Sequence, residues 1–416
     1  MIQDIQKPAL HPRIFYVGGF RFPDGDAAAH RVYGIGKALR DSGYEVVFLG
    51  AESAGRPQDA IPGIGYSFDD FQYQPAGNEG NDLLHRAFRL WHTHLSGLSV
   101  MARLKKHWTD SSVAVFAYQA SSPLLAQLRC FCHRRNAVLV SDVVEWYDRR
   151  HITGGRFGPF ALDSEIRMRF VNRLSDGIIA ISRYLESYYG RVGIPTLRVP
   201  ALVNLDTKCW NNLTSKPSCE SRIKLAFVGI AGQKDLVVNA IRGIACLGPQ
   251  ARAIELSLVG PSAQELRIAL GRESGLLNTL RNSLRFTGRL PHTEALGRLA
   301  QADFSIILRP DQRFAHAGFP TKLVESLAMG VPVICNLTSD IGLYVRDGQE
   351  GLIVQDSSPE AFADGLKRIL GLTFAQRTAM RHHARHRAEQ SFDYRNWAEP
   401  LGRFMESVLA RRGVIK

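Results

Sequence analysis

The sequence has few of the features that mark secreted, metal-binding or membrane-spanning proteins. Its six cysteines are scattered, and Cys130 and Cys132 have no second cysteine pair at metal-ligand spacing, so we expect neither a disulfide framework nor a zinc site. No apolar run reaches the ~18 to 20 residues that a transmembrane helix needs, and the start has no apolar core of a signal peptide. We therefore expect a cytoplasmic protein without a bound metal.

The chain does have the length and apolar content of a folded protein of two domains. It comprises 416 residues, of which 45% are hydrophobic. Its formal net charge of +13 favours anionic partners such as nucleic acid, anionic lipid or phosphorylated small molecules. Because no zinc-finger, helix-turn-helix or RNA-binding pattern accompanies this charge, we expect no nucleic acid partner.

Apolar strand patterns alternate with helical patterns along two successive series. The first series opens with a strand at residues 13–19, a helix at 27–42 and a strand at 44–50, and the second opens with a strand at 223–229. This order predicts two α/β domains with parallel sheets. We expect an N-terminal domain at 1–205, a C-terminal domain at 206–385, and a final helix at 386–416 that packs back on the first domain.

The most informative segment is AGFPTKLVESLAMGVPVI, residues 317–334. Pro320 suits the first turn of a helix and Gly330 suits its end, so we expect the helix to start at Pro320. The amides at its start and Lys322 form an anion site for a diphosphate. Thr321, Lys322 and Glu325 share one face, which places Glu325 to accept ribose hydroxyl hydrogens. The alternative is a capped amphipathic helix with a surface lysine and glutamate.

The run P-T-K-x-x-E-S-x-A-x-G-x-P-V-I resembles the donor-binding signature of the retaining glycosyltransferases of family 4, which have the GT-B fold. Its P-x-K-x-x-E form resembles a branch of bacterial polysaccharide and O-antigen transferases. Further resemblances follow in family order at residues 176–189, 199–204, 225–241, 256–260, 286–294 and 301–310. The resemblance implies two doubly wound Rossmann-like domains that face a cleft.

The same resemblance implies the reaction and its partners. The donor is a nucleoside diphosphate sugar, most commonly of UDP or GDP, and no cofactor takes part. The sugar moves with retention to a hydroxyl of a glycan or of a lipid-linked acceptor, in the assembly of cell-surface polysaccharide. Ala317 stands where the family commonly has a glutamate that contacts the sugar, so the identity of the sugar stays open.

The loop GIAGQKD after the strand at 223–229 supplies further donor-site candidates. Gly229, Gly232 and Lys234 lie at places that match the family, and the usual arginine is replaced by Ile230. We therefore expect Lys234 and Lys322 to provide the cationic contacts that stabilise the diphosphate as a leaving group. The alternative for Lys234 is a solvated loop lysine.

Candidates in the first domain follow its first strand. Gly18 and Gly19 end that strand and permit a ligand to approach the backbone. Asp26 is a suitable helix cap, which places His30 and Arg31 in the first turns as ligands for the acceptor or the donor phosphate. A loop glycine pair with a surface histidine and arginine is the alternative.

Acidic residues follow another strand of the first domain. Asp142 and Glu145 are candidates to accept the acceptor's proton or to orient its hydroxyl, and the histidine that the family often has near Asp142 is absent. Pairing with Arg149 and Arg150 is an equal alternative. The D-x-D at residues 24–26 is better explained by a turn and a helix cap than by a metal site.

Two wider alternatives stay open. The basic amphipathic stretch at residues 81–108 fits a peripheral contact with an anionic membrane surface, but a helix packed on its own sheet is the commoner explanation. The architecture also suits a sugar-nucleotide 2-epimerase, which needs no acceptor, or a non-catalytic protein that binds nucleotide sugars.

Overall fold

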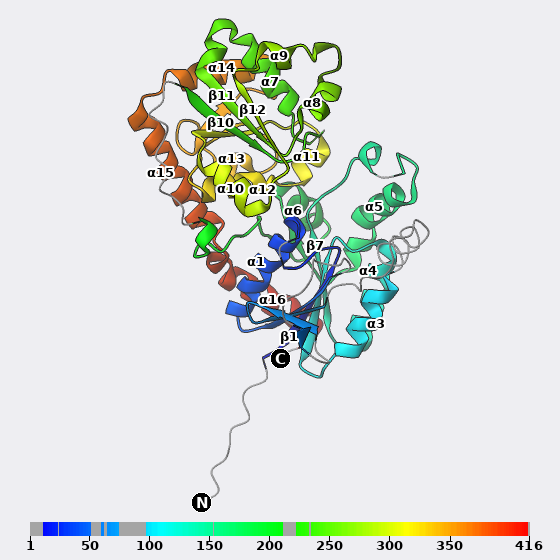
Figure 1. Cartoon of the computed structure of the whole chain (residues 1–416). Helices are drawn as coiled ribbons and strands as arrows, with labels where there is room; N and C mark the ends of the chain where they lie inside the picture. Colours follow the sequence, from blue (N-terminus) through cyan, green and yellow to red (C-terminus); the bar gives the residue numbers. More distant parts are fainter. Residues whose placement is uncertain are drawn as a thin grey trace, which may run out of the picture. The chain divides into compact units, whose positions relative to one another are not determined.

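A computed structural model of the chain describes residues 11–23, 25–50, 60–61, 65–74, 97–152, 154–210, 222–232 and 234–414. The chain divides into two compact units (Figure 1). Unit 1 comprises residues 1–202 and 394–416, and unit 2 comprises residues 203–393. The observed divisions thus fall at 202/203 and 393/394, compared with 205/206 and 385/386 in the expectation from the sequence.

Unit 1 is built on a nine-stranded sheet with the order β3-β4-β5-β2-β1-β6-β7-β8-β9. From β5 to β9 neighbouring strands are parallel, and only the pairs β3–β4 and β4–β5 are antiparallel. The strands are β1 (Arg13–Gly18), β2 (Glu45–Gly50), β3 (Ala60–Ile61), β4 (Gly65–Phe68), β5 (Phe71–Gln74), β6 (Ser112–Tyr118), β7 (Val138–Val143), β8 (Gly177–Ala180) and β9 (Thr196–Arg198).

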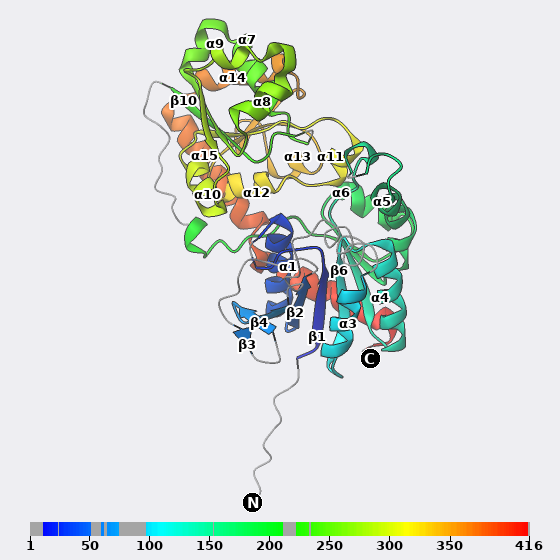
Figure 2. The ribbon, with the colours of Figure 1, turned by 45° about the vertical axis from the view of Figure 1, so that its right-hand side comes forward.

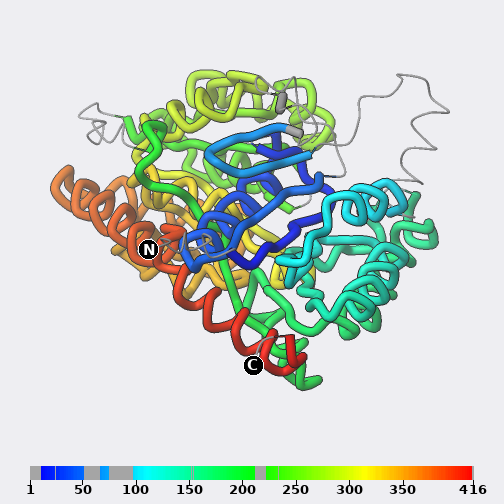
Figure 3. The backbone as a smooth tube through the Cα atoms, turned by 90° about the horizontal axis from the view of Figure 1, so that it is seen from below, coloured from blue at the N-terminus to red at the C-terminus, as the bar shows by residue number. Residues whose placement is uncertain are grey.

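Helices cover both faces of this sheet (Figure 2), because apolar side chains of the strands alternate between two cores. One core includes Ile35 and Leu401, and the other includes Leu104 and Leu128. The last helix, α16, is the red end of the tube in Figure 3 and packs against α1. The helices are α1 (Ala27–Asp41), α3 (Leu98–His107), α4 (Ser122–Arg134), α5 (Pro159–Arg169), α6 (Arg183–Gly190) and α16 (Ala398–Arg412), with the 3-10 turns η2 (Arg149–His151), η3 (Val171–Leu174) and η7 (Tyr394–Trp397).

Unit 2 has a six-stranded, fully parallel sheet with the order β12-β11-β10-β13-β14-β15. Counted within the unit this is the order 3-2-1-4-5-6 of a Rossmann fold, in which ligands bind at the carboxyl ends of the strands where the order reverses. Here that point lies between β10 and β13. The strands are β10 (Ile223–Val228), β11 (Ile254–Val259), β12 (Leu284–Gly288), β13 (Phe304–Ile307), β14 (Val333–Asn336) and β15 (Gly351–Val354).

The helices of unit 2 bury an apolar core that includes Leu225, Ile241, Leu256 and Leu366. They are α7 (Val237–Cys246), α8 (Ala263–Leu270), α9 (Leu276–Thr279), α10 (His292–Ala300), α11 (Arg313–Ala317), α12 (Thr321–Ala328), α13 (Ile341–Tyr344), α14 (Pro359–Leu370) and α15 (Phe374–Ser391). The short 3-10 turns are η4 (Lys208–Trp210), η5 (Gly248–Ala253) and η6 (Gly271–Glu273). Both units therefore have the doubly wound architecture that the sequence predicts.

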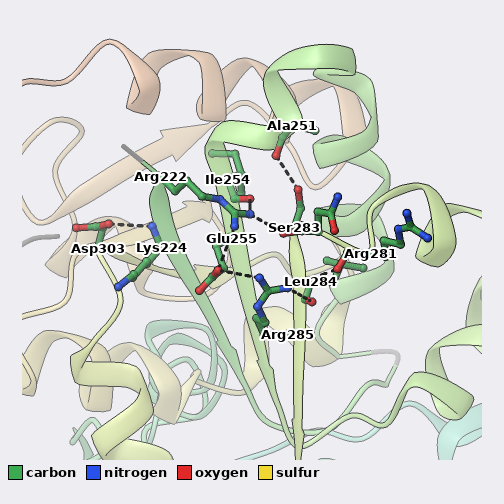
Figure 4. A network of polar contacts seen from close by, with 11 residues as sticks. Arg222, Lys224, Ala251, Ile254, Glu255, Arg281, Ser283, Leu284, Arg285 and Asp303 are labelled. Atoms are coloured by element: carbon green, nitrogen blue, oxygen red, sulfur yellow. Dashed lines mark hydrogen bonds and ion pairs between the residues drawn. The ribbon is translucent and has the colours of Figure 1, made fainter. Parts of the chain in front are cut away.

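Polar contacts tie the strands of unit 2 together at their amino ends (Figure 4). Arg222 donates to the Glu255 carboxylate at 3.3 Å, and an Arg285 nitrogen lies 3.5 Å from the same oxygen. The Asp303 carboxylate accepts from the Lys224 backbone N–H at 2.8 Å. These polar groups are hydrogen-bonded or paired with one another at the amino end of the sheet. The ligand-binding end of a Rossmann fold is the opposite, carboxyl end.

The predicted helix in the informative segment is present, with one difference at its start. It begins at Thr321 because Pro320 is the N-cap residue rather than the first helical residue, with extended backbone angles (φ −75°, ψ 104°). Gly330 has φ +64°, as expected for the residue after the last turn. The Val331 N–H then donates to the Ser326 carbonyl at 2.8 Å, which closes a Schellman motif.

The basic stretch at residues 81–108 is described only from residue 97 onward; residues 81–96 lie outside the described part. Its helix α3 turns Val100, Met101 and Leu104 into the core of unit 1. The Arg103 guanidinium donates to backbone carbonyls of β5 and β2. For this part of the stretch, packing on the sheet of its own unit is the explanation that the contacts support. In the described residues, no helix has the length and apolar character to cross a membrane.

Candidate functional site

The start of α12 is the only part of this helix that reaches solvent. Of its eight residues, Thr321, Lys322 and Glu325 are partly exposed, and the other five are buried. These three are the residues that the sequence places on one face. The N-cap Pro320 has no side-chain acceptor, so the amides of the first turn are not capped from that position.

Lys322 is held over the turn that follows β10. Its ammonium donates to the Asp235 carboxylate at 2.6 Å, and both side chains are 19% exposed. The same nitrogen lies 4.3 Å from the ring centroid of the buried Phe227. The lysine from α12 therefore stands at the carboxyl end of β10, beside the point where the strand order reverses.

Glycine at the end of β10 makes this approach possible. Gly229 has φ +143°, and a Cβ atom at this position would lie 2.4 Å from the Lys322 ammonium. A Cβ on Gly260, at the end of β11, would lie 2.0 Å from the Gly229 carbonyl oxygen. Gly232 has ample room for a side chain, so its backbone does not require glycine. Lys234 is exposed in the same turn.

Glu325 has a partner that the sequence did not suggest. Its carboxylate lies 3.0 Å from Nε2 of His292, the first residue of α10, and the two side chains are 20% and 40% exposed. Glu325 is one helical turn beyond Lys322, so the carboxylate and the ammonium lie on one side of α12. The pair gives Glu325 a fixed direction while leaving part of the carboxylate accessible.

The position that commonly holds a sugar-contacting glutamate carries no polar group here. Ala317 ends α11 and is fully buried. The neighbouring His316 pairs with Asp311 at 2.5 Å and accepts a hydrogen bond from the Ser339 N–H. The Ser339 hydroxyl donates to the Gly318 carbonyl at 2.6 Å. Polar groups thus surround this segment without replacing the glutamate itself.

In unit 1, Arg31 and Asp142 form a buried ion pair, and this corrects the expectation that they meet ligands. The guanidinium donates to the Asp142 carboxylate at 2.7 and 3.0 Å and to the Val199 and Pro200 carbonyls, and the side chains are 3% and 0% exposed. The Tyr16 hydroxyl donates to the same carboxylate at 2.5 Å. A carboxylate enclosed in this way cannot take a proton from an acceptor unless the pair breaks.

The titration of the groups around Asp142 fits a permanent structural pair. Burial, reinforced by the Asp142 carboxylate, raises the pKa of Tyr16 well above its usual value. Burial alone would lower the pKa of Arg31, but the adjoining carboxylate raises it on balance. The predicted pairing of Asp142 with Arg149 or Arg150 is wrong, since Arg149 lies 3.6 Å from Glu165 and Arg150 bonds Asp148.

The other candidates of unit 1 are placed without forming one cluster around a ligand. Gly18 has φ +147°, and a Cβ there would lie 2.3 Å from the Tyr118 carbonyl oxygen, so this glycine permits β1 and β6 to approach. Gly19 and His30 are partly exposed. Asp26 caps α1 by accepting from the Ala29 N–H at 2.7 Å, as predicted, and Asp24 lies outside the described residues.

Glu145 follows β7 in a segment that is neither helix nor strand and is partly exposed. It hydrogen-bonds Tyr147, whose pKa burial chiefly raises. Its proposed part in catalysis stays a prediction.

Within unit 2 the structure brings together two groups of candidate residues, each with a member missed from the sequence. Gly229 and Lys322 meet Asp235, and Glu325 meets His292. Asp235 directly follows Lys234 in the GQKD loop, so the motif that pointed to Lys234 also contains Asp235. His292 stands in the turn after the third strand of the unit, and only the three-dimensional fold brings it to α12.

Comparison with known proteins assigns a class to this arrangement. Residues 222–371, which contain the β10 turn, His292 and the whole of α12, match the family described as "Glycosyl transferases group 1". The predicted GT-B fold is confirmed by solved structures that cover nearly the whole chain, two of which are described as glycosyltransferases. The chain is thus a glycosyltransferase by class, and neither an epimerase nor a non-catalytic binding protein is favoured.

Three particular proteins illustrate the similarity. The chain is 23% identical to glycogen synthase of Mycobacterium tuberculosis over 398 residues, which cover 92% of this chain and 91% of that protein. It is 21% identical to an uncharacterized glycosyltransferase of Methanocaldococcus jannaschii over 207 residues, which cover 49% of this chain and 51% of that protein. The crystal structure of Anabaena HepE in complex with UDP and glucose superposes with a TM-score of 0.63 at 14% identity, covering 95% of this chain and all of that one.

Proposed function

We propose that the chain transfers a sugar from a nucleoside diphosphate sugar, with UDP or GDP as the nucleotide, to an acceptor hydroxyl, and that it retains the anomeric configuration. The observation that carries the proposal is the position of Lys322 over Gly229 at the carboxyl end of β10, with Glu325 one turn further along α12. In a Rossmann fold this end receives the phosphates of a nucleotide. The HepE structure, described with bound UDP and glucose, has the same fold.

Each candidate residue of unit 2 has a role in this proposal. Lys322 and the N-terminal amides of α12 neutralise the diphosphate, and Lys234 adds charge from the exposed turn. Gly229 lets the Lys322 ammonium reach the turn, and the open surroundings of Gly232 leave space there for the phosphates. Glu325 accepts hydrogen bonds from the ribose hydroxyls, while His292 fixes its direction. Thr321 offers its hydroxyl beside the same amides.

The proposed reaction does not depend on a protein side chain that acts as a strong base. The bond between the sugar C1 and the phosphate oxygen breaks, and a new bond forms between C1 and the acceptor oxygen. The departing phosphate oxygen takes the acceptor's proton. The protein's contribution is the stabilisation of negative charge on the leaving diphosphate by Lys322 and the helix N-terminus. Because Asp142 is sealed in its ion pair, we do not assign it as a base.

The acceptor belongs to the same proposal. We propose a glycan or a lipid-linked acceptor in the assembly of cell-surface polysaccharide, in the cytoplasm at the inner face of the membrane. The P-x-K-x-x-E form of the signature supports this, through its resemblance to the polysaccharide and O-antigen branch. The net charge of +13 favours an anionic surface.

A thermal-shift screen of UDP-, GDP- and ADP-sugars tests the donor. A ligand that binds the folded protein raises its Tm by mass action. We expect one nucleotide series to raise the Tm at saturation, and the sugar-free diphosphate of that series to do the same. If no nucleotide shifts the Tm, the proposal fails. Once the donor is identified, its turnover is measured with and without glycan acceptors. Epimerisation proceeds on the donor alone, whereas transfer requires the acceptor.

A further inference from the structure

Helix α5 and the turn η3 of unit 1 present an apolar outer face, contrary to the usual polar exterior of a surface helix. Leu162, Ile166, Phe170 and Leu174 form what we call the apolar row and are 56%, 38%, 63% and 51% exposed. The first two lie one helical turn apart on α5, whereas Phe170 follows the end of α5 and Leu174 ends η3. Phe157, just before α5, is 89% exposed. The inner face of α5 is buried. Both ribbon views show α5 beside α4 (Figures 1 and 2).

Arginine side chains line this apolar row. Arg169 stands over the ring of the buried Trp146 at 5.9 Å, and Arg173 stands over Tyr188 at 5.5 Å. Arg156 lies over the ring of Phe157 at 5.7 Å. The aromatic rings restrict where these guanidinium groups lie, so positive charge is fixed beside Phe170 and Leu174 rather than spread over the surface.

The acidic residues of the same segment are all engaged within unit 1. Residues 148–174 contain six arginines and three acidic residues. Glu165 is 4% exposed and accepts from Trp146 and Arg169. Asp163 accepts from the Ser122 N–H, and Asp148 caps η2. Of the arginines, Arg167 is buried and Arg149, Arg150 and Arg169 lie against two of these carboxylates, so the positive charge of the outer face comes from Arg156 and Arg173.

We propose that the face formed by Phe157, α5 and η3 binds the surface of a bilayer that contains anionic lipids. Apolar side chains flanked by arginines are the pattern by which a helix lies in the headgroup region, with the apolar row inserted and the guanidinium groups on the phosphates. A second copy of the chain is a poorer partner, because a symmetric contact would bring the two sets of arginines together. This inference does not depend on the proposed donor or reaction.

Vesicle sedimentation of the full chain tests the surface. We use vesicles of phosphatidylcholine alone and of equal parts phosphatidylcholine and phosphatidylglycerol. We expect binding to the anionic vesicles only, weakening with added salt because exposed charges are screened. Absence of binding to the anionic vesicles overturns the proposal, and so does equal binding to both compositions.

Two pairs of variants locate the contact. Leu162→Ser with Phe170→Ser removes apolar side chains, and Arg156→Gln with Arg173→Gln removes charge. We expect each pair to weaken partitioning, by about fivefold for each arginine lost. Because all four residues are exposed, both variants should keep the wild-type circular dichroism spectrum and Tm.

Matched controls lie on unit 2. Ile268→Ser on α8 removes a side chain that is 73% exposed, and Arg267→Gln with Arg272→Gln removes two exposed charges. We expect these controls to bind vesicles like the wild type. Equal loss in the controls would show that general charge or hydrophobicity, rather than this face, drives binding, and would overturn the proposal. A dimer in sedimentation velocity that the α5 variants dissolve would also overturn it, in favour of a contact between copies.

Discussion

The two units share a strand order around their first strand, yet they use charge at the carboxyl end of the sheet in opposite ways. Unit 1 joins Arg31 to Asp142, and the two side chains are 3% and 0% exposed. Unit 2 joins Lys322 to Asp235, and both side chains are 19% exposed. The first pair is closed on all sides by protein groups, whereas the second can exchange its partner for an anion from solvent.

This difference in burial decides which pair maintains the fold and which one is available to a ligand. Removing one member of a buried pair leaves an unpaired charge in a medium of low dielectric, and the cost is large. A partly exposed pair contributes little to stability, because water competes for both ions. In the proposed function, we therefore expect Lys322 to leave Asp235 for a diphosphate at a small cost.

The largest predicted effect concerns the stability of unit 1. Its absence would contradict the comparison of the two ion pairs. We expect Arg31→Ala to lower the free energy of unfolding of this unit by about 3 to 5 kcal/mol, because Asp142 is left buried without its partner. Urea unfolding followed by tryptophan fluorescence measures the change.

Arg150→Ala is the matched control for that measurement. Arg150 pairs with Asp148 on the surface of the same unit, and its side chain is 65% exposed, so its loss should leave the unfolding curve unchanged. If Arg31→Ala unfolds at the wild-type urea concentration, the buried pair does not maintain the fold and the contrast between the units disappears.

The next effect is on binding in unit 2. We expect Lys322→Ala to weaken binding of the nucleoside diphosphate by about 2 kcal/mol, the usual contribution of a hydrogen bond to a charged group. The stability of the fold should change far less than in Arg31→Ala. Isothermal titration calorimetry measures the binding.

Lys367→Ala serves as its control, since Lys367 also forms an ion pair, with Asp364, on the surface of unit 2. It should bind nucleotide like the wild type. A stability loss in Lys322→Ala as large as in Arg31→Ala would mean that both pairs are structural.

A smaller effect concerns the direction of Glu325. We expect His292→Ala to weaken nucleotide binding by about 1 kcal/mol, because Glu325 loses the neighbour 3.0 Å away. His292→Gln, which keeps a polar group of similar reach, should recover part of the affinity. The loss should vanish in a Glu325→Ala background, since the two residues act through one another. Equal losses in both backgrounds would separate His292 from Glu325.

The smallest predicted effect is a gain in nucleotide affinity rather than a loss. We expect Asp235→Asn to strengthen diphosphate binding by about 0.5 kcal/mol, because the carboxylate no longer competes with the ligand for Lys322. Titration at low and high salt should show a steeper salt dependence than in the wild type. Asp364→Asn, in the exposed pair with Lys367, should change neither quantity. Weaker binding by Asp235→Asn would mean that Asp235 mainly positions the lysine.

Much of the fold could be predicted from local patterns. Long buried strands such as β1, β6 and β10 have unbroken apolar runs that end in glycine or a polar turn, so the sequence identifies them without tertiary information. The short strands β3, β4, β5 and β9 were missed. They form the two margins of the sheet, where pairing with a neighbour rather than an apolar run makes the strand.

The site could be predicted only where one helix carries it. Thr321, Lys322 and Glu325 are neighbours on α12 by helical spacing alone. Their partners Asp235 and His292 come from other segments, 87 and 33 residues away along the chain, so no local pattern shows that they pair with residues of α12. Arg31 was misjudged for the same reason: its partner Asp142 is 111 residues away. An arginine at the start of a helix looks exposed until the sheet that encloses it is known.

Binding of a nucleoside, its diphosphate and its 2′-deoxy diphosphate to three proteins tests the central claim most directly. In titration calorimetry, the wild type should bind the diphosphate more tightly than the nucleoside, and Lys322→Ala should lose most of that difference. Glu325→Ala should lose about 1 to 3 kcal/mol with the ribose ligand and a smaller amount with the deoxy ligand, which keeps only the 3′ hydroxyl as a donor to Glu325. Wild-type affinity for all three ligands in both variants would contradict the assignment of the α12 N-terminus as the nucleotide site.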